Sequence, residues 1–528
     1  MKKELVNNNH VIDDRFSFAN DNVILHDQKL ETKPRGYFKD ALIRFTKNKA
    51  SIVAAIIIGL IILFALITPL ATPSNVKTLM DPYYAKKGPR NTSLYALGFD
   101  GGSNITLTDR TLVFEAAKGV AAEFDDNQTQ PISIGESLDS YYQPVISVGN
   151  PYKAVTGRND KYNYDSRVDQ YLSVGFKFIN IEQKDFNNIK EFEKEKGIKI
   201  LYPLIANNEY TFDTQSADAA NYWYKTVGKC DPIKFVDGNA VVQSYSEELI
   251  LEENYARNED GSYKYFEYSG GGSVETAQYK VRVLYYTYYQ YMYGREPNYL
   301  FGTDTSGYSM IYRLATGVRL SLLVAILVSV INFIIGAIYG AIEGYYGGAV
   351  DMVMERVSDI LNDVPFIVVV TLFQLHFAAK AGSFVCLLFA YVLTGWIGTA
   401  ASVRTQFYRY KNQEYVLAAR TLGASNRRIM WKHIFPNTLG TLITSSVLVI
   451  PSVIFSESML SYLGIVKLGG ATTTSLGTLL SDASSIWTSY PSLMIFPALI
   501  ISLLMICFNL FGNGLRDAFN PQLRGSDE

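Results

Sequence analysis

Long stretches without a charged residue constrain the fold of this chain more than any other feature. Five of them run over residues 50–71, 320–342, 381–403, 434–456 and 483–515. A helix of about 20 mostly apolar residues crosses the hydrocarbon core of a bilayer. Each of these stretches reaches that length, so the sequence predicts a membrane-spanning helix within each of them.

A sixth uncharged stretch, over positions 364–379, is too short to cross a bilayer by itself. We expect its helix to begin earlier, within residues 351–363, which makes six crossings. The composition alone, 48% hydrophobic with a mean hydropathy of +0.05, is that of a soluble protein because it averages these spans with polar segments. The balanced net charge of -2 argues against a generic nucleic-acid binder, which needs a strongly basic surface.

The distribution of lysine and arginine predicts the orientation. Residues 33–49 carry six basic residues and one acid, and residues 404–433 carry seven and one. Because basic loops stay in the cytoplasm, we expect both segments and both termini to be cytoplasmic. Residues 343–363 depart from this rule, since their only cation is Arg356. Residues 37–49 have the helical spacing of an amphipathic helix on the membrane surface.

Residues 72–316 are then extracytoplasmic, and they are long enough to bury a core. Residues 71–303 hold 26 of the 38 tyrosines. Here the patterns predict a mixed α and β domain, with a helix over 184–196 and strands over 178–181, 198–205 and 278–293. The tyrosine run within 285–293 is either a surface that stacks on ligands or, more commonly, core packing or an aromatic belt beside the membrane.

Motifs for covalent or nucleotide chemistry are missing from the sequence. It has no G-x-x-x-x-G-K-[ST] loop, no H-E-x-x-H helix and no G-x-S-x-G elbow. We therefore expect no catalytic residue, no metal site and no cofactor bound by this chain.

Residues 414–437, between the fourth and fifth predicted spans, carry the most information. Their pattern predicts a short helix through Leu422, a break at Gly423 and a second helix capped by Ser425. Glycine adopts the left-handed backbone that ends a helix, and serine accepts a hydrogen bond from an amide two or three residues later. Ala418 and Ala419 leave a small face that another surface can approach closely.

Arg420, Arg427 and Arg428 surround that face with positive charge. The segment is either a solvated connecting loop or a basic helix-turn-helix suited to docking a soluble partner.

Ala418-Ala419-x-x-x-Gly423, with Pro436 thirteen residues further on, resembles the cytoplasmic coupling motif of bacterial ABC importer permeases. That motif is usually written Glu-Ala-Ala. Here Leu417 stands at the glutamate position, and Glu414 is the nearby acid. The resemblance implies an ATPase-coupling loop that uses Glu414, Ala418, Ala419, Arg420, Gly423, Ala424, Ser425 and Pro436.

Further motifs are similar to those of oligopeptide and dipeptide permeases, specifically the second subunit of the pair. They are Gly302-Thr303-Asp304, Gly344-Tyr345-Tyr346-Gly347-Gly348, Phe508-Asn509-Leu510 and Gly514-Leu515-Arg516-Asp517. Gly307-Tyr308-Ser309 departs from that group, which usually has Gly-Arg-Asp. The resemblance covers roughly residues 36–72 and 300–524, so the extracytoplasmic domain is an insertion.

The resemblance implies a peptide importer subunit that forms half of a pore with a homologous permease subunit. Two cytoplasmic ABC ATPases would bind the coupling loops, and an extracytoplasmic substrate-binding protein would deliver the peptide. Mg²⁺ and ATP would be bound by the ATPases, so the chain itself would be a non-catalytic transport subunit in the bacterial cell membrane.

The predicted fold class is an α-helical polytopic membrane protein with six transmembrane helices, the type I ABC importer permease fold and an inserted extracytoplasmic α+β domain. Its predicted parts are a polar cytoplasmic segment (1–35), an amphipathic helix and first span (36–71), the insertion (72–300), the permease core (301–518) with its coupling loop (404–436), and a cytoplasmic tail (519–528).

Polar residues within the spans are candidates for the transport pathway. Glu457 is an ionisable group at membrane depth, which is a functional candidate by default, although a hydrogen-bonded link between helices is at least as common. Asn332, Gln374 and Asn509 are similar candidates, with the linking role favoured.

Two other classes of protein compete with the permease. A membrane-anchored receptor would use the extracytoplasmic domain alone and would not need a basic coupling loop. An ion-coupled secondary transporter would favour paired ionisable residues at membrane depth, where only Glu457 is found.

Overall fold

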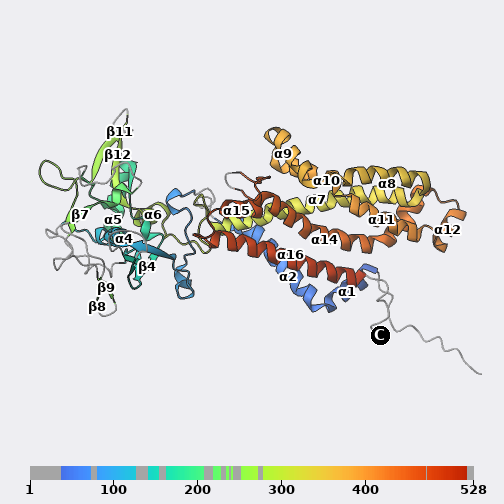
Figure 1. The fold of residues 1–528 in the computed structure, drawn as a ribbon, viewed down its shortest axis with the longest axis horizontal. Coiled ribbons are helices and arrows are strands. Elements are labelled where there is room, and N and C mark those ends of the chain that lie inside the picture. The colour runs from blue at the N-terminus through green and yellow to red at the C-terminus, as the bar shows by residue number, and fades with distance from the viewer. Residues whose placement is uncertain are drawn as a thin grey trace, which may run out of the picture.

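The computed structural model describes residues 37–72, 80–126, 141–153, 162–206, 218–226, 234–236, 239–241, 251–271, 277–470 and 473–519. Figure 1 shows a bundle of long helices with a lobe of sheets and shorter helices at one end. We call the bundle the helical core. The lobe, residues 80–309, lies between the first and second long helices of the chain, and we call it the inserted domain.

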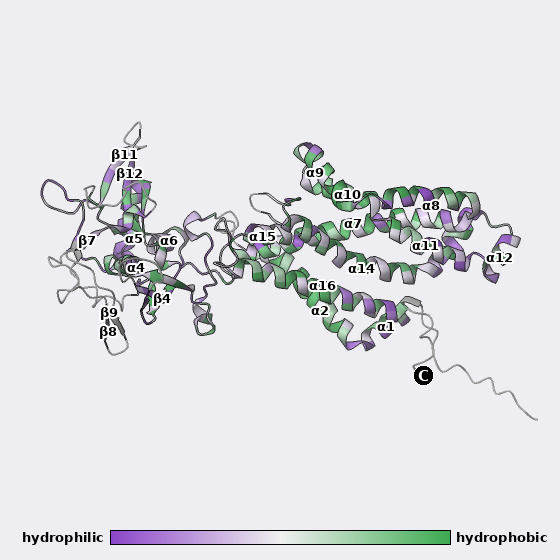
Figure 2. Cartoon of the chain, in the orientation of Figure 1, coloured by the Kyte–Doolittle hydropathy of each residue, from purple (hydrophilic) through white to green (hydrophobic). Residues whose placement is uncertain are grey.

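The helical core consists of α1 (Tyr37–Lys47), α2 (Lys49–Ala71), α7 (Met310–Tyr346), α8 (Gly348–Asn362), α9 (Phe366–Ala381), α10 (Ser383–Thr394), α11 (Ile397–Tyr410), α12 (Glu414–Thr421), α13 (Asn426–Arg428), a π-helical turn (Ile429–Ile434), α14 (Phe435–Tyr462), α15 (Leu476–Ala483) and α16 (Ser492–Phe519). In the described residues, five helical segments are long and apolar enough to cross a membrane, and α8 with α9 makes a sixth if the bent pair is one span. Figure 2 shows these helices as mainly hydrophobic. The predicted polytopic membrane fold is confirmed.

The third span differs from the sequence prediction. We expected one helix that begins within residues 351–363, but α8 and α9 are separate helices bent by 69° at their break. Pro365 stands directly before α9. The residue before a proline is disfavoured in the helical conformation, which interrupts the helix there. The last uncharged stretch also divides, because α15 ends at Ala483 and α16 begins only at Ser492.

Helix α7 packs unusually close to α11 along a line of glycines. A Cβ atom on Gly340 would lie 2.1 Å from the carbonyl oxygen of Ala400, and one on Gly344 would lie 2.7 Å from that of Arg404. Gly336 approaches α11 in the same way. Small residues four apart let two helix backbones meet where lipid provides no hydrophobic driving force. This contact fixes α11 against the second half of α7.

The inserted domain contains two four-stranded antiparallel sheets, which confirms its mixed α and β class. One has the order β1-β4-β2 with β3 beside β4, and the other has the order β11-β12-β5 with β6 beside β12. The elements are η2 (Pro82–Tyr84), η3 (Thr92–Leu97), β1 (Gly102–Thr108), α4 (Asp109–Ala122), β2 (Val145–Val148), β3 (Tyr152–Lys153), β4 (Tyr162–Asp169), η5 (Leu172–Val174), β5 (Phe176–Glu182), α5 (Gln183–Lys196), β6 (Leu201–Tyr202), η6 (Ala219–Asn221), β7 (Tyr224–Thr226), β8 (Lys234–Val236), β9 (Asn239–Val241), β10 (Leu251–Glu253), β11 (Phe266–Gly270), β12 (Gln278–Leu284) and α6 (Tyr285–Tyr293).

The predicted strand over 178–181 and helix over 184–196 are confirmed by β5 and α5. The long strand over 278–293 was wrong in its second half, which forms α6. Strand β12 ends where Leu284 pairs with Phe176, the first residue of β5. Beyond that point β5 offers no partner, so the backbone satisfies its hydrogen bonds within a helix.

The predicted strand over 198–205 shrinks to the two residues of β6. The strand begins later than predicted because the amides of Ile200 and Leu201 both donate to the carboxylate of Glu193, at 2.5 and 2.7 Å, and not to a neighbouring strand. Its continuation is interrupted by Pro203, which has no amide proton to give to a neighbouring strand.

The segments that enter and leave the inserted domain are joined by backbone hydrogen bonds at its root. The amide of Arg90 donates to the carbonyl of Tyr299 at 2.9 Å, and the amide of Lys86 donates to that of Asp304 at 2.9 Å. The domain therefore rests on a paired stem and not on two independent linkers.

Buried contacts fix this stem to the start of α7. The carboxylate of Asp304 accepts a hydrogen bond from the guanidinium of Arg313 on α7 at 2.8 Å, and both side chains are buried. Gly307 has a φ of +87°, and a Cβ atom there would lie 1.9 Å from the carbonyl oxygen of Asp81. These buried contacts thus fix the inserted domain to the first turn of α7.

We predict that Gly307→Val destabilises this stem. Any non-glycine residue with this backbone costs about 1–2 kcal/mol, and the collision with Asp81 adds to that cost. Gly98→Val is the matched control, because Gly98 has a φ of +86° but open space around it. The thermal midpoint of the purified protein should fall further for Gly307→Val, and equal losses would show that the stem is not tightly packed.

Candidate functional site

The coupling loop between α11 and α14, residues 411–434, turns where its sequence predicts, and the predicted range 404–436 also takes in the end of α11 and the start of α14. Helix α12 ends in a pair of hydrogen bonds, from the amide of Gly423 to the carbonyl of Arg420 and from that of Ala424 to that of Ala419, both 3.0 Å. This Schellman arrangement needs a left-handed residue, and Gly423 supplies it with a φ of +81°. The side chain of Ser425 then accepts from the amide of Arg428 and caps the next helix.

The inner side of this loop packs on the ends of α7 and α11. Val416 and Ile429 are fully buried in a cluster with Phe407. The hydroxyl of Tyr345 on α7 donates to the side chain of Asn426 at 2.8 Å. The loop is therefore a rigid extension of the helical core. Figure 1 shows α12 at the end opposite the inserted domain.

The outer side of the loop holds most of the predicted coupling residues. Ala419 is buried and Ala424 is half-buried. Leu417 is 44% exposed and Leu422 is 88% exposed. The other predicted residues are exposed, and they are Glu414, Ala418, Arg420, Gly423, Ser425 and Pro436.

Positive charge borders this exposed surface. Ser425, Arg427, Arg428 and Trp431 line a hollow of about 470 Å³. Within the described residues, neither arginine lies within 4.0 Å of a carboxylate. The loop presents apolar side chains and unneutralised cations together, as a protein-docking surface does.

Glu457 lies at a junction between helices. Its side chain is fully buried, and its carboxylate accepts from the hydroxyls of Ser321 on α7 at 2.9 Å and Ser461 at 3.0 Å. The amide of Leu476 at the start of α15 donates to the same Ser321 hydroxyl at 3.4 Å. Glu457 therefore links α14 to α7, and through Ser321 to α15, which supports the interhelical interpretation.

The other polar span residues do not gather around Glu457. Asn332 is buried and its amide donates to the carbonyl of Tyr391 at 3.5 Å, which joins α7 to α10. Gln374 donates to the carbonyl of Ser383 at 2.9 Å across the α9–α10 turn. Asn509 is exposed and donates within its own helix to Met505 at 2.9 Å. The four candidates thus form separate contacts and not one polar cluster.

Sequence reasoning missed one charged cluster, around Arg404 on α11. Its guanidinium binds Asp351 at 2.6 Å and Glu355 at 2.8 Å, both on α8, and lies 3.7 Å from the carboxylate of Glu343. The acidic excess of residues 343–363, which departed from the orientation rule, was the signal that could have found it. The ion pairs of Arg404 hold α8 against α11, in the part of α11 that leads into the loop.

Comparisons with known proteins agree with this arrangement. Residues 333–525 match the family described as binding-protein-dependent transport system inner membrane component. Residues 36–89 match the N-terminal TM domain of oligopeptide transport permease C. The two segments leave residues 90–332 between them.

Three of the relatives are 41–42% identical over 224–230 residues. The oligopeptide transport system permease protein OppC of Bacillus subtilis is 41% identical over 42% of this chain and 72% of its own length. OppC of Escherichia coli is 42% identical over 43% of this chain and 74% of its length, and the dipeptide transport system permease protein DppC of Lactococcus lactis is 41% identical over 42% and 64%.

The chain belongs to the OppC/DppC family of ABC transporter permeases. It is a multi-pass membrane protein, and membership of this family implies ATPase partners and a binding protein.

We predict that Glu457→Leu destabilises this OppC-type permease while Asn509→Leu does not. The first variant leaves the hydroxyls of Ser321 and Ser461 without their acceptor, and buried unpaired groups cost about 1–3 kcal/mol each. The second removes only one exposed contact within a helix. The thermal midpoint in detergent measures the difference, and equal midpoints would contradict the linking role of Glu457.

Proposed function

We propose that this chain forms half of the translocation pore of an ATP-driven importer of oligopeptides or dipeptides. A homologous permease subunit would supply the other half. Two ATPases would dock on the coupling loops, and a substrate-binding protein would deliver the peptide. The observation that carries this proposal is the packed coupling loop over residues 411–434 with its exposed apolar and basic face.

The exposed surface of the loop indicates how an ATPase would be held. Leu417 replaces the usual glutamate, so its exposed side chain would make an apolar contact where a charge pair is typical. Leu422 adds a second apolar contact, and Arg427 and Arg428 would attract acidic side chains of the partner. Glu414, exposed in the first turn of α12, is the carboxylate left to pair with a cation.

Closure of the two ATPases would move the coupling loops toward each other. Since Val416 and Ile429 are buried against α7 and α11, the loop transmits this displacement to those helices as a rigid body. Both arrangements of the spans exist in equilibrium, and the state of the ATPases shifts that equilibrium from inward-facing to outward-facing. ATP is hydrolysed by the partners, and this chain contributes no catalytic residue.

We further propose that the coupling loop is cytoplasmic and the inserted domain extracytoplasmic. The loop carries the excess of lysine and arginine that marks a cytoplasmic segment. The inserted domain would lie over the pore, fixed to α7, where it would dock the binding protein or gate the outer mouth of the pore.

Gly423→Val should reduce binding of the ATPases. Valine disfavours the left-handed backbone that closes the Schellman motif, so the exposed face of α12 would change its shape. Gly464→Val is the matched control, because Gly464 has a φ of +74°, also has open space around it and lies after α14, far along the chain from the loop. Pull-down of the ATPases and peptide uptake should fall severalfold for Gly423→Val only; unchanged uptake at normal membrane levels would remove the proposal.

Excision of the inserted domain tests its role. Arg90 and Tyr299 are antiparallel bridge partners, so residues 91–298 can be replaced by a two-glycine turn. We expect the shortened chain to reach the membrane and retain the ATPases, because the coupling loop is untouched. Co-purification of the binding protein should weaken, and intact association together with normal uptake would exclude both proposed roles of the domain.

A further inference from the structure

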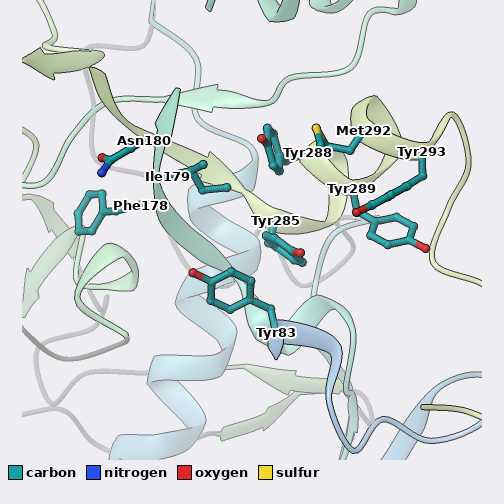
Figure 3. A pocket seen from close by; sticks show the side chains of 9 residues that line it. All are labelled: Tyr83, Phe178, Ile179, Asn180, Tyr285, Tyr288, Tyr289, Met292 and Tyr293. Carbon is teal, nitrogen blue, oxygen red and sulfur yellow. The ribbon is translucent and has the colours of Figure 1, made fainter. Parts of the chain in front are cut away.

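The inserted domain contains a pocket of about 380 Å³ that the transport cycle described above does not use. Its lining comes from η2, from β5 and from α6, and Figure 3 shows Tyr83 on one side with Tyr288 and Met292 on the other. The lining residues are Tyr83, Phe178, Ile179, Asn180, Tyr285, Tyr288, Tyr289, Met292 and Tyr293. Binding sites for small ligands typically have a volume of about 300–1,000 Å³ and are lined mainly by apolar and aromatic side chains.

The helical conformation of α6 explains why so many tyrosines reach one pocket. Side chains four residues apart stack on the same face of a helix. The rings of Tyr289 and Tyr293 are accordingly 4.6 Å apart. The ring of Tyr285 continues the wall, 4.7 Å from that of Tyr83 and 6.4 Å from that of Tyr288.

Part of the hydrogen-bonding capacity of this lining is free. The hydroxyl of Tyr285 donates to Asp81 at 2.8 Å, so that group is already used. Within the described residues, the hydroxyls of Tyr83, Tyr288 and Tyr293 and the side-chain amide of Asn180 have no hydrogen-bond partner. The pocket therefore combines apolar ring faces with donors and acceptors at their edges.

The charges around the pocket favour a neutral ligand. No lining residue is charged. Lys177 and Lys280 already lie over the rings of Tyr83 and Phe178, at 5.4 and 4.2 Å from the ring centroids, and would repel a second cation. On the other side, burial together with the charge of Asp185 raises the pKa of Tyr288 to about 12, and that carboxylate would repel an anion.

We propose that this pocket binds an uncharged apolar or aromatic side chain of a peptide, with the free phenols and Asn180 bonding to the adjacent peptide backbone. Ile179 and Met292 support this ligand class over a sugar, because they offer aliphatic and flexible surface that accepts side chains of different shape. Tyr83 lies two residues from Asp81, which contacts Gly307 in the stem on α7. The pocket is therefore at the root of the inserted domain, and its role as a substrate subsite rests on the proposed peptide import.

The test uses the full chain in lipid nanodiscs and saturation-transfer NMR. The probe is an acetylated and amidated Ala-Phe-Ala tripeptide, compared with the same peptide containing glycine in place of phenylalanine and with an N-acetylglucosamine disaccharide. We expect saturation of the phenylalanine ring protons and at least tenfold weaker binding of the other two probes.

Met292→Glu is the test variant, because Met292 is 51% exposed and a carboxylate there places charge in the pocket without opening the core. Ile146→Glu in β2 is the control, at a residue that is 49% exposed outside the pocket. We expect Met292→Glu to weaken binding of the phenylalanine peptide about tenfold, because a hydrated carboxylate replaces an apolar contact and would have to lose water when the peptide binds. Ile146→Glu should leave it unchanged.

Absence of binding by the phenylalanine peptide, equal effects of the two variants, or preferential binding of the disaccharide would each overturn the inference. Co-purification of the ATPases is measured on the same preparations. If the ATPases are retained while the peptide does not bind, the pocket inference fails alone. If the ATPases are absent from the wild type, the proposed function fails.

Discussion

Helix α7 is the element on which the rest of the structure depends. Its 37 residues make it about 55 Å long, well beyond the hydrocarbon thickness of a bilayer. At its first turn Arg313 is paired with Asp304 of the stem, and near its last turn Tyr345 bonds to the coupling loop. One rigid element thus connects the inserted domain with the loop at the opposite end of the helical core.

Close backbone contact and buried charge make α7 effective as such a link. The glycines at 336, 340 and 344 leave no room between α7 and α11, so the two helices have to move together. Arg404 adds α8 to this unit through two carboxylates. Because removal of one member of such a cluster leaves the others uncompensated, the cluster fixes relative positions more than it adds stability. Arg427 and Arg428 lie outside this cluster and remain available to a partner.

The sequence predicted correctly those parts of the chain whose structure depends on residues close to one another in the sequence. The spans follow from uncharged stretches, and the turn in the coupling loop follows from Gly423 and Ser425, whose backbone roles need no distant partner. The failures lie where a distant segment decides. Strand β12 ends because β5 ends, and the acidic stretch over 343–363 is balanced by Arg404, which lies on α11, three helices after α8. Neither relation can be seen in a short segment of the sequence, because each joins residues that are far apart along the chain.

The tyrosines of α6 show why composition left two interpretations open. On a helix, Tyr286 turns into the core and is 1% exposed, while Tyr288 and Met292 reach the pocket. Tyr289, also 1% exposed, belongs both to the core and to the pocket wall. Core packing and a ligand-facing surface are therefore both present in one short element. In a strand, alternate residues point to opposite faces, so Tyr285, Tyr289 and Tyr293 would share one face. Tyr286 would share the other face with Tyr288 and Met292, instead of turning away from them into the core. The change from strand to helix at Leu284 thus decides which tyrosines line the pocket.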